Sequence, residues 1–173
     1  MKKSMLVEVQ YFPNLEYFIN ILEHDIVLIE AWESYQKQSY RNRCHILTAN
    51  KVDVLSVPVM YSGRNVLIRD VKIDYTHKWM NDHWRAIRSA YGKAPFFEYY
   101  SDFFHNILWK KSVFLFDLNL EIMTLCLKLL KIDKEIQYTT LFAKELGEEI
   151  ENLRSHIHPK KENNTYSIAW TPY

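Results

Sequence analysis

The sequence predicts an α+β fold in which a small mixed sheet packs against several helices. Short apolar runs typical of strands lie in the first 75 residues, and amphipathic helical patterns dominate the region after them. Glycine accounts for only 3 of the 173 residues, which disfavours folds built on many tight hairpins. We therefore expect a single domain over 1–173, with a sheet-rich part at 1–75 and a helical part at 76–160.

The first elements predict a strand–helix–strand unit. Residues 5–9 are typical of a short strand, and Asn14 can cap an amphipathic helix at 15–24. The continuous apolar run at 26–29 suits a buried strand. A right-handed crossover through the helix would make the two strands parallel.

Polar side chains follow both strands of this unit. Gln10 and Tyr11 come after the first strand, and Trp32 and Glu33 come after the second. The carboxyl ends of parallel strands meet at one sheet edge, where ligand sites are common. We therefore predict that Gln10 and Tyr11 bind substrate there.

A hairpin completes the predicted sheet. Residues 54–60 indicate a strand, which Pro58 assigns to a sheet edge or a bulge because proline has no N–H to donate. A turn at 62–65 leads to a returning strand at 66–73.

The remaining pattern is helical. Thr76 is the expected cap of a helix at 77–91, Gly92 is its expected stop, and another helix lies within 97–110. No internal repeat or linker separates these helices from the strands.

Segment 112–131 is apolar enough to be compared with a membrane span. Its polar residues recur at intervals of four, three and four, so they form one solvated stripe, and we predict a buried helix without a membrane span. Asn119 falls on the opposite, buried side and must have a hydrogen-bond partner. That amide is either a structural clamp or a ligand-facing group.

The stretch 35–43 combines cations, phenols and amides without an acidic residue. Such donors can hold a phosphate or carboxylate and orient a polar ligand. The alternative is a basic loop with no binding role. The candidate substrate-binding residues here are Gln36, Lys37, Tyr40, Arg41, Asn42 and Arg43.

Composition excludes several classes of function. A formal net charge of +1 does not favour nucleic acid as a partner, and no GxGxxG or P-loop string is present. Cys44 and Cys126 match no metal or redox spacing, so we expect no metal, no cofactor and a reduced, cytoplasmic setting. The N-terminal residues lack the apolar core of a signal peptide, which agrees with that location.

Two further groups carry candidate chemistry. His83 lies beside an apolar helix face and is either a general base or a core histidine with a hydrogen bond. Arg154, His158 and Lys160 form either a loop over a substrate site or a solvated basic helix end.

Other reactive groups have weaker support. Cys44 is flanked by Arg43 and His45, yet it fits the start of a strand better than a nucleophile. Glu30 and Glu33 could act as acid or base, although surface carboxylates are the commoner case.

Six motifs recur in order over nearly the whole chain, at 10–18, 33–43, 56–59, 83–100, 116–119 and 153–160. Together they resemble the WbqC-like family of bacterial surface-polysaccharide gene clusters. Tyr11 replaces the proline usual in the first motif, and the family pattern continues beyond residue 173 with a segment that we expect to be missing here.

The resemblance implies a role in the biosynthesis of O-antigen or other surface polysaccharide, with a sugar or nucleotide-sugar as substrate. It also suggests a transferase that modifies an amino sugar, such as a glycine transferase. The alternative is a non-catalytic binding or scaffold protein that works with other polysaccharide-biosynthesis proteins.

Overall fold

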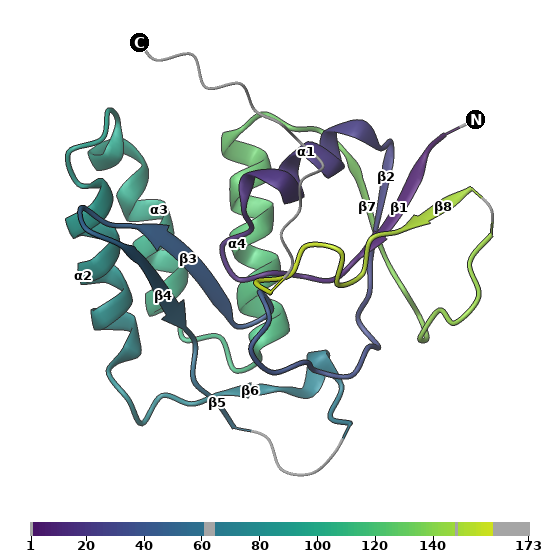
Figure 1. Ribbon diagram of the computed structural model, residues 1–173, viewed down its shortest axis with the longest axis horizontal. Coiled ribbons are helices and arrows are strands. Elements are labelled where there is room, and N and C mark those ends of the chain that lie inside the picture. The colour runs from purple at the N-terminus through teal and green to yellow at the C-terminus, as the bar shows by residue number, and fades with distance from the viewer. Residues whose placement is uncertain (1, 61–64, 148, 161–173) are drawn as a thin grey trace.

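The computed structural model describes residues 2–60, 65–147 and 149–160. Its described residues have the predicted α+β architecture, with one parallel sheet, two antiparallel strand pairs and helices (Figure 1). The two antiparallel pairs are separate from the parallel sheet.

The central sheet contains four parallel strands in the order β7-β2-β1-β8. β1 (Ser4–Val7) and β2 (Ile26–Ile29) form its middle, as the strand–helix–strand pattern predicted. Its outer strands are β7 (Glu135–Tyr138) and β8 (Ile150–Asn152), which the sequence did not suggest. Thus the segment at 76–160 contains two strands as well as helices.

The crossover between the middle strands is helix α1 (Leu15–Glu23). The Asn14 side chain accepts a hydrogen bond from the Tyr17 backbone N–H at 3.0 Å, which confirms the predicted cap. Tyr17, Phe18 and Ile21 turn toward the core, so apolar burial fixes this helix against the sheet.

The first antiparallel pair joins β3 (Arg43–Leu47) to β4 (Val52–Ser56). Cys44 and Ile46 are buried while His45 and Leu47 are exposed, the alternation expected of a strand with one covered face. The predicted strand at 54–60 is interrupted, because Pro58 has no N–H to continue the ladder.

The second pair joins the two-residue strands β5 (Val59–Met60) and β6 (Lys72–Ile73). The expected returning strand at 66–73 is interrupted by a 3-10 turn, η1 (Ile68–Asp70), and only its last two residues form the strand β6. Only Asn65 of the predicted turn at 62–65 lies within the described residues.

Three helices follow, α2 (Trp79–Tyr91), α3 (Phe97–Trp109) and α4 (Leu115–Leu129). The prediction that Thr76 caps α2 is wrong, because its backbone N and hydroxyl donate to Asp74 at 2.8 and 2.7 Å and the helix begins after Lys78. Gly92 follows α2 at the predicted stop.

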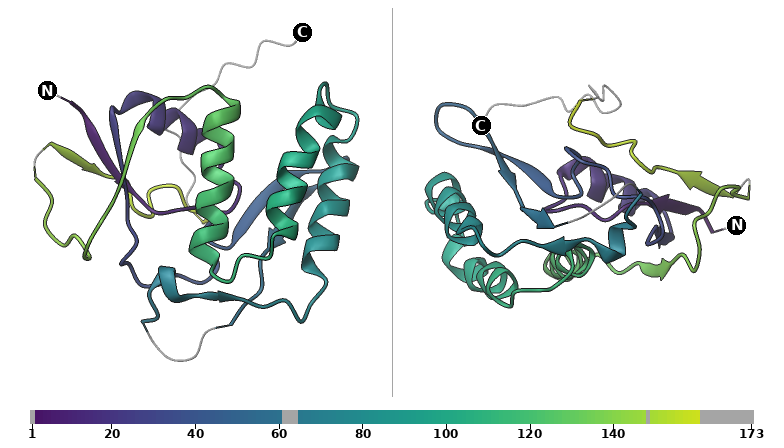
Figure 2. Two further views of the ribbon diagram at one scale, coloured as in Figure 1. Left: turned by 180° about the vertical axis from the view of Figure 1, so that it is seen from behind. Right: turned by 90° about the horizontal axis from the view of Figure 1, so that it is seen from below.

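Helix α4 lies between the parallel sheet and the α2–α3 pair (Figures 1 and 2). Leu115, Leu118, Ile122 and Met123 are at most 1 % exposed, so this helix is the centre of the core. Among the described residues, no helix combines the length and apolar character that crossing a membrane requires.

Candidate functional site

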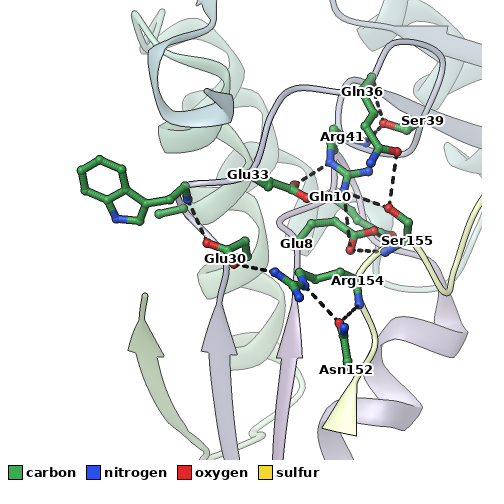
Figure 3. A network of polar contacts seen from close by, with 12 residues as sticks. Glu8, Gln10, Glu30, Glu33, Gln36, Ser39, Arg41, Asn152, Arg154 and Ser155 are labelled. Atoms are coloured by element: carbon green, nitrogen blue, oxygen red, sulfur yellow. Dashed lines mark hydrogen bonds and ion pairs between the residues drawn. The ribbon is translucent and has the colours of Figure 1, made fainter. Parts of the chain in front are cut away.

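The carboxyl edge of the parallel sheet holds a group of buried charged side chains (Figure 3). Glu8 follows β1, Glu30 follows β2, and Glu33 lies a few residues further on. Arg41 comes from the loop before β3, and Arg154 comes from the segment after β8. The three carboxylates and Arg41 are each at most 5 % exposed. Charges so deeply buried are tolerated only when they are paired.

Arg41 is the centre of this network. Its Nε and Nη2 each donate to one carboxylate oxygen of Glu33 at 2.6 Å. Nη2 also donates to Ser155 Oγ at 3.1 Å and lies 3.8 Å from Glu8 Oε2. The planar guanidinium therefore joins the 33–43 stretch to the ends of β1 and β8.

Burial and pairing act on Glu33 in opposite directions. Burial raises the pKa of its carboxyl above the ordinary value of 4.5, and the hydrogen bonds from Arg41 lower it. The net direction is upward. Removal of the arginine would therefore favour protonation of this carboxyl still further.

Glu30 is the second centre and is fully buried. Its Oε1 accepts hydrogen bonds from Thr139 Oγ1 at 2.7 Å and from the Trp32 backbone N at 3.0 Å. Its Oε2 accepts from Arg154 Nη1 at 2.9 Å and from the Ala143 backbone N at 3.4 Å. Four donors from different segments thus fix this carboxylate.

The backbone at Ser155 is held in a conformation unfavourable for serine. Its φ is 54°, in the left-handed region, and its N–H donates to Glu8 Oε2 at 2.8 Å. Gln10 Nε2 donates to the other oxygen of Glu8 at 3.1 Å, whereas Gln10 Oε1 is buried and has no partner among the described residues. Glu8 therefore holds the segment that carries Arg154.

A cavity of about 600 Å³ opens beside this network, and we call it the Arg154 cleft. The Arg154 guanidinium lies 4.8 Å from the ring centroid of Phe142 and is bound through Nε to Asn152 Oδ1 at 3.0 Å. The cleft thus combines aromatic walls with guanidinium, amide and hydroxyl groups. Its lining residues are Trp32, Glu33, Ser34, Tyr35, Gln36, Phe142, Asn152, Arg154 and Ser155.

The structure brings together four of the predicted substrate-binding residues. Gln10, Gln36, Arg41 and Arg154 all belong to the network around the cleft, and Gln36 Oε1 accepts a hydrogen bond from Ser155 Oγ at 3.4 Å. Gln10 and Arg41 are each 1 % exposed, so they position neighbours, whereas Gln36 and Arg154 line the cleft.

Two predicted amides make structural contacts. Asn119 Nδ2 donates to the Arg41 backbone carbonyl at 2.6 Å, which satisfies the expected need for a partner. Asn42 Nδ2 donates to the Val57 carbonyl at 3.1 Å. Asn119 thus holds the backbone behind Arg41, and that position favours the clamp interpretation.

Other predicted residues lie outside the cleft lining. Lys37 is exposed, Tyr40 packs edge-on against His45, and Arg43 Nε is buried without a partner in the described part of the chain. His158 Nδ1 accepts a hydrogen bond from the Lys160 backbone N at 3.2 Å. Substrate binding by these residues stays a prediction.

His83 belongs to a different buried cluster. Its Nδ1 lies 2.9 Å from the Tyr11 hydroxyl, and the ring also makes a hydrogen bond with the Ser56 backbone. Burial lowers the pKa of His83 to about 4, so the ring is neutral near pH 7. Neither His83 nor Tyr11 lines the Arg154 cleft, which favours a core role for both side chains. Catalysis by His83 stays a prediction.

Cys44 is also buried, and burial raises the pKa of its thiol to about 12. A protonated thiol is a poor nucleophile, which agrees with the strand interpretation. Within 2–60, 65–147 and 149–160, no three His, Cys, Asp or Glu side chains are grouped to hold a metal ion.

Sequence reasoning missed several contributors to the site. Glu8 carried a signal, because it interrupts an apolar strand pattern just where the strand ends. Glu30 directly follows an apolar strand, and the expectation that Glu30 and Glu33 lie at the surface is wrong. Thr139 and Ser155 carried no local signal, since strands β7 and β8 bring them to the edge.

Comparisons with known proteins place the chain in a family. The chain is 36 % identical over 103 residues to the uncharacterized protein Rv1507c of Mycobacterium tuberculosis, a match that covers 59 % of this chain and 44 % of that protein. The chain thus spans less than half the length of this curated relative. No solved structure matches the chain. The sequence model of the WbqC-like protein family matches residues 9–168, and the chain therefore belongs to that family.

Proposed function

We propose that this protein is a transferase that modifies an activated or amino sugar during the biosynthesis of bacterial surface polysaccharide. Family membership supports the biological setting, and the Arg154 cleft supports the kind of ligand. The observation that carries the proposal is the meeting of aromatic rings with fixed polar donors at the carboxyl edge of a parallel sheet.

The cleft suits a sugar that carries an anionic group. The apolar face of a sugar ring can pack against Trp32 or Tyr35, while Gln36 and Asn152 can orient its hydroxyls. Within the described part of the chain, the Arg154 guanidinium donates through Nε to Asn152 and through Nη1 to Glu30. Its Nη2 can therefore donate to a phosphate or carboxylate of the ligand. Glu30 keeps this guanidinium in place before any ligand arrives.

A thermal-shift screen with UDP-, GDP- and dTDP-linked sugars tests the proposal. A ligand at 100 times its Kd stabilises by about 2.7 kcal/mol, which corresponds to roughly 5–10 °C for a chain of this size. Each variant is compared with its own ligand-free Tm, so a change in basal stability does not obscure binding.

The decisive pair of variants is Arg154→Gln and Arg85→Gln. Arg154→Gln removes the charge but keeps a donor for Glu30, and it should abolish the shift. Arg85 lies on α2 with its side chain 78 % exposed, so its variant should respond like the wild type. Equal shifts in both variants, or no shift with any sugar nucleotide, would contradict the proposal.

A non-catalytic scaffold is the second candidate, because α3 and its start expose several aromatic side chains. Phe96 is 74 % exposed, Tyr99 is 69 % exposed and Phe103 is 46 % exposed. An apolar cavity of about 400 Å³ lies against the same helix. Affinity purification from the source bacterium distinguishes the candidates: a polysaccharide-biosynthesis partner lost on Tyr99→Ser would favour the scaffold.

A further inference from the structure

The apolar cavity of about 400 Å³ lies between the α2–α3 pair and strand β3 (Figure 1), and we call it the Tyr91 cavity. Ten of its thirteen lining residues are apolar or aromatic. The hydroxyl of Tyr91 on α2 accepts a hydrogen bond from the Leu47 backbone N–H at 3.3 Å, which ties the helix to the strand. Phe12 lies opposite Phe104 of α3, with their ring centroids 5.8 Å apart. Such a lining is suited to a hydrocarbon group.

A polar cavity of about 640 Å³ adjoins it on the same two helices, and we call it the His105 cavity. Trp84, Phe97 and Ser101 line both cavities, so the two spaces meet along these side chains. The ring centroid of Trp84 lies 6.4 Å from that of Phe97 and 5.1 Å from that of His105. His105 in turn stacks on Trp109 at 3.9 Å. Packed rings thus form the boundary between an apolar space and a polar one.

The polar groups of the His105 cavity are suited to an uncharged ligand that carries hydroxyls. Arg88 and the ring nitrogens of His105 can donate to or accept from hydroxyls, and Asp102 supplies acceptors. The cavity therefore holds charges of both signs, which favours neither a simple anion nor a simple cation. Trp84 adds an aromatic surface against which the apolar face of a sugar ring can pack.

Phe96 gives an independent indication that this region contacts a ligand. It stands between Pro95 and Phe97, which line the Tyr91 cavity, and it is 74 % exposed. Its φ is 62°, in the left-handed region that phenylalanine rarely adopts, and Phe12 in the cavity wall has a φ of 46°. Neither burial nor backbone preference accounts for phenylalanine at position 96, and backbone strain of this kind gathers at ligand sites.

We propose that the two cavities together bind a glycolipid, with its hydrocarbon chain in the Tyr91 cavity and its sugar headgroup in the His105 cavity. Both volumes fall within the range of about 300–1,000 Å³ that is common for ligand pockets. Trp84 lies where the chain meets the sugar. Among the described residues, neither cavity shares a lining residue with the Arg154 cleft, so this inference goes beyond the proposed function and does not depend on it.

Isothermal titration calorimetry with n-octyl β-D-glucopyranoside, kept below its critical micelle concentration, tests the proposal. Methyl β-D-glucopyranoside supplies the headgroup alone, and octyl tri(ethylene glycol) ether supplies the same chain without a sugar. Octyl glucoside should bind most tightly of the three. Burial of about half of its additional methylene groups should make it about 100-fold tighter than methyl glucoside. Hydrogen bonds to the sugar should make it about fivefold tighter than the ether.

Two variants, each with a matched control, assign the chain and the headgroup to their cavities. Ala94→Asp places a charge in the apolar lining at an exposed position and should weaken both octyl ligands at least about tenfold. Ser89→Asp adds the same charge to α2 outside both linings and should not. His105→Phe keeps the stacking on Trp109 but removes the ring nitrogens, so it should weaken octyl glucoside about fivefold and leave the ether unchanged. The exposed His77→Phe is its control.

Absence of octyl glucoside binding, equal affinity for octyl glucoside and the ether, or wild-type binding in Ala94→Asp overturns the inference. Equal affinity would mean that the Tyr91 cavity accepts any apolar group, as a docking site for a protein side chain would. Arg154→Gln should leave octyl glucoside binding unchanged, and Ala94→Asp should leave stabilisation by sugar nucleotides unchanged. Failure of the glycolipid site is therefore distinguishable from failure of the proposed function.

Discussion

Substitution of Arg41 by methionine gives the strongest test of the buried charge network. The variant keeps an apolar side chain of similar length but removes two 2.6 Å bonds to Glu33, a 3.1 Å bond to Ser155 and the 3.8 Å ion pair with Glu8. Two carboxylates at most 5 % exposed then lack a cation. Loss of one member of such a buried pair costs about 3–5 kcal/mol, a large share of the 5–15 kcal/mol that stabilises an ordinary domain.

Urea unfolding measures this cost directly. We expect the midpoint to fall with an unchanged m-value, together with a Tm lower by roughly 10 °C. Arg85→Met is the matched control, since the exposed Arg85 donates to Asp82 at 3.1 Å and its loss should cost under about 1 kcal/mol. If the two variants were destabilised equally, the network would contribute no more than a surface ion pair.

The pH dependence of stability gives a second test of this network, because the direction of the change can be predicted. Burial raises the pKa of Glu33, and in Arg41→Met the opposing hydrogen bonds are absent. A carboxyl whose folded pKa is raised binds its proton more tightly in the folded state, so stability is lost as pH rises through that pKa. The cost of Arg41→Met should therefore be larger at pH 8 than at pH 5, and an equal cost at both would refute an ionised, unpaired Glu33.

Three further predictions follow from single contacts. Because the pKa of His83 is lowered to about 4 from 6.5, its contribution to stability is complete above pH 6.5 and is lost as pH falls toward 4. Urea unfolding should show a decline of roughly 3 kcal/mol over that range, and His83→Gln should flatten it. Asn119→Ala should cost about 1–3 kcal/mol in the same assay through its 2.6 Å bond to Arg41, while the exposed Thr124→Ala on the same helix should stay within about 0.5 kcal/mol. Ser155→Gly should be more stable than Ser155→Ala by about 1 kcal/mol, because both lose the hydroxyl but only glycine relieves the positive φ of 54°; equal melting temperatures would argue against strain at this position.

The local parts of the fold could be predicted because their signals are local. The apolar run at 26–29 and the cap at Asn14 are short-range patterns, and the structure has both. The strands β7 and β8 could not be predicted in this way. Strand β7 alternates Ile136 and Tyr138 with polar residues over only four positions, and β8 has only three residues. Such short patterns are weak signals, so these strands depend on pairing with β2 and β1.

The part of the candidate site that follows β1 and β2 could be predicted, because the strand–helix–strand crossover could be predicted. Parallel pairing of β1 and β2 brings the residues after each strand to one sheet edge, as their positions indicated. Gln10 donates to Glu8 there, and Arg41 contacts both Glu8 and Glu33. Some partners of these carboxylates lie more than 100 residues away, such as Ser155 for Glu8 and Thr139 for Glu30, so no local pattern could indicate them. The basic stretch was predicted as a contact surface for an external anion, whereas Arg41 holds the chain's own Glu33.

The energetics of the network support a role beyond stability. A buried ion pair is often no better for stability than apolar residues of similar volume, because each charge must lose its hydration. A fold that needed only a core could fill the space around Arg41 and Glu33 with leucine and methionine. The double variant Arg41→Met/Glu33→Leu should therefore recover much of the stability lost in Arg41→Met. It should still bind sugar nucleotides less tightly, because Arg41 would no longer hold the segment of Ser155 beside Arg154. Recovered stability with wild-type affinity would mean that the buried charges do not position the cleft.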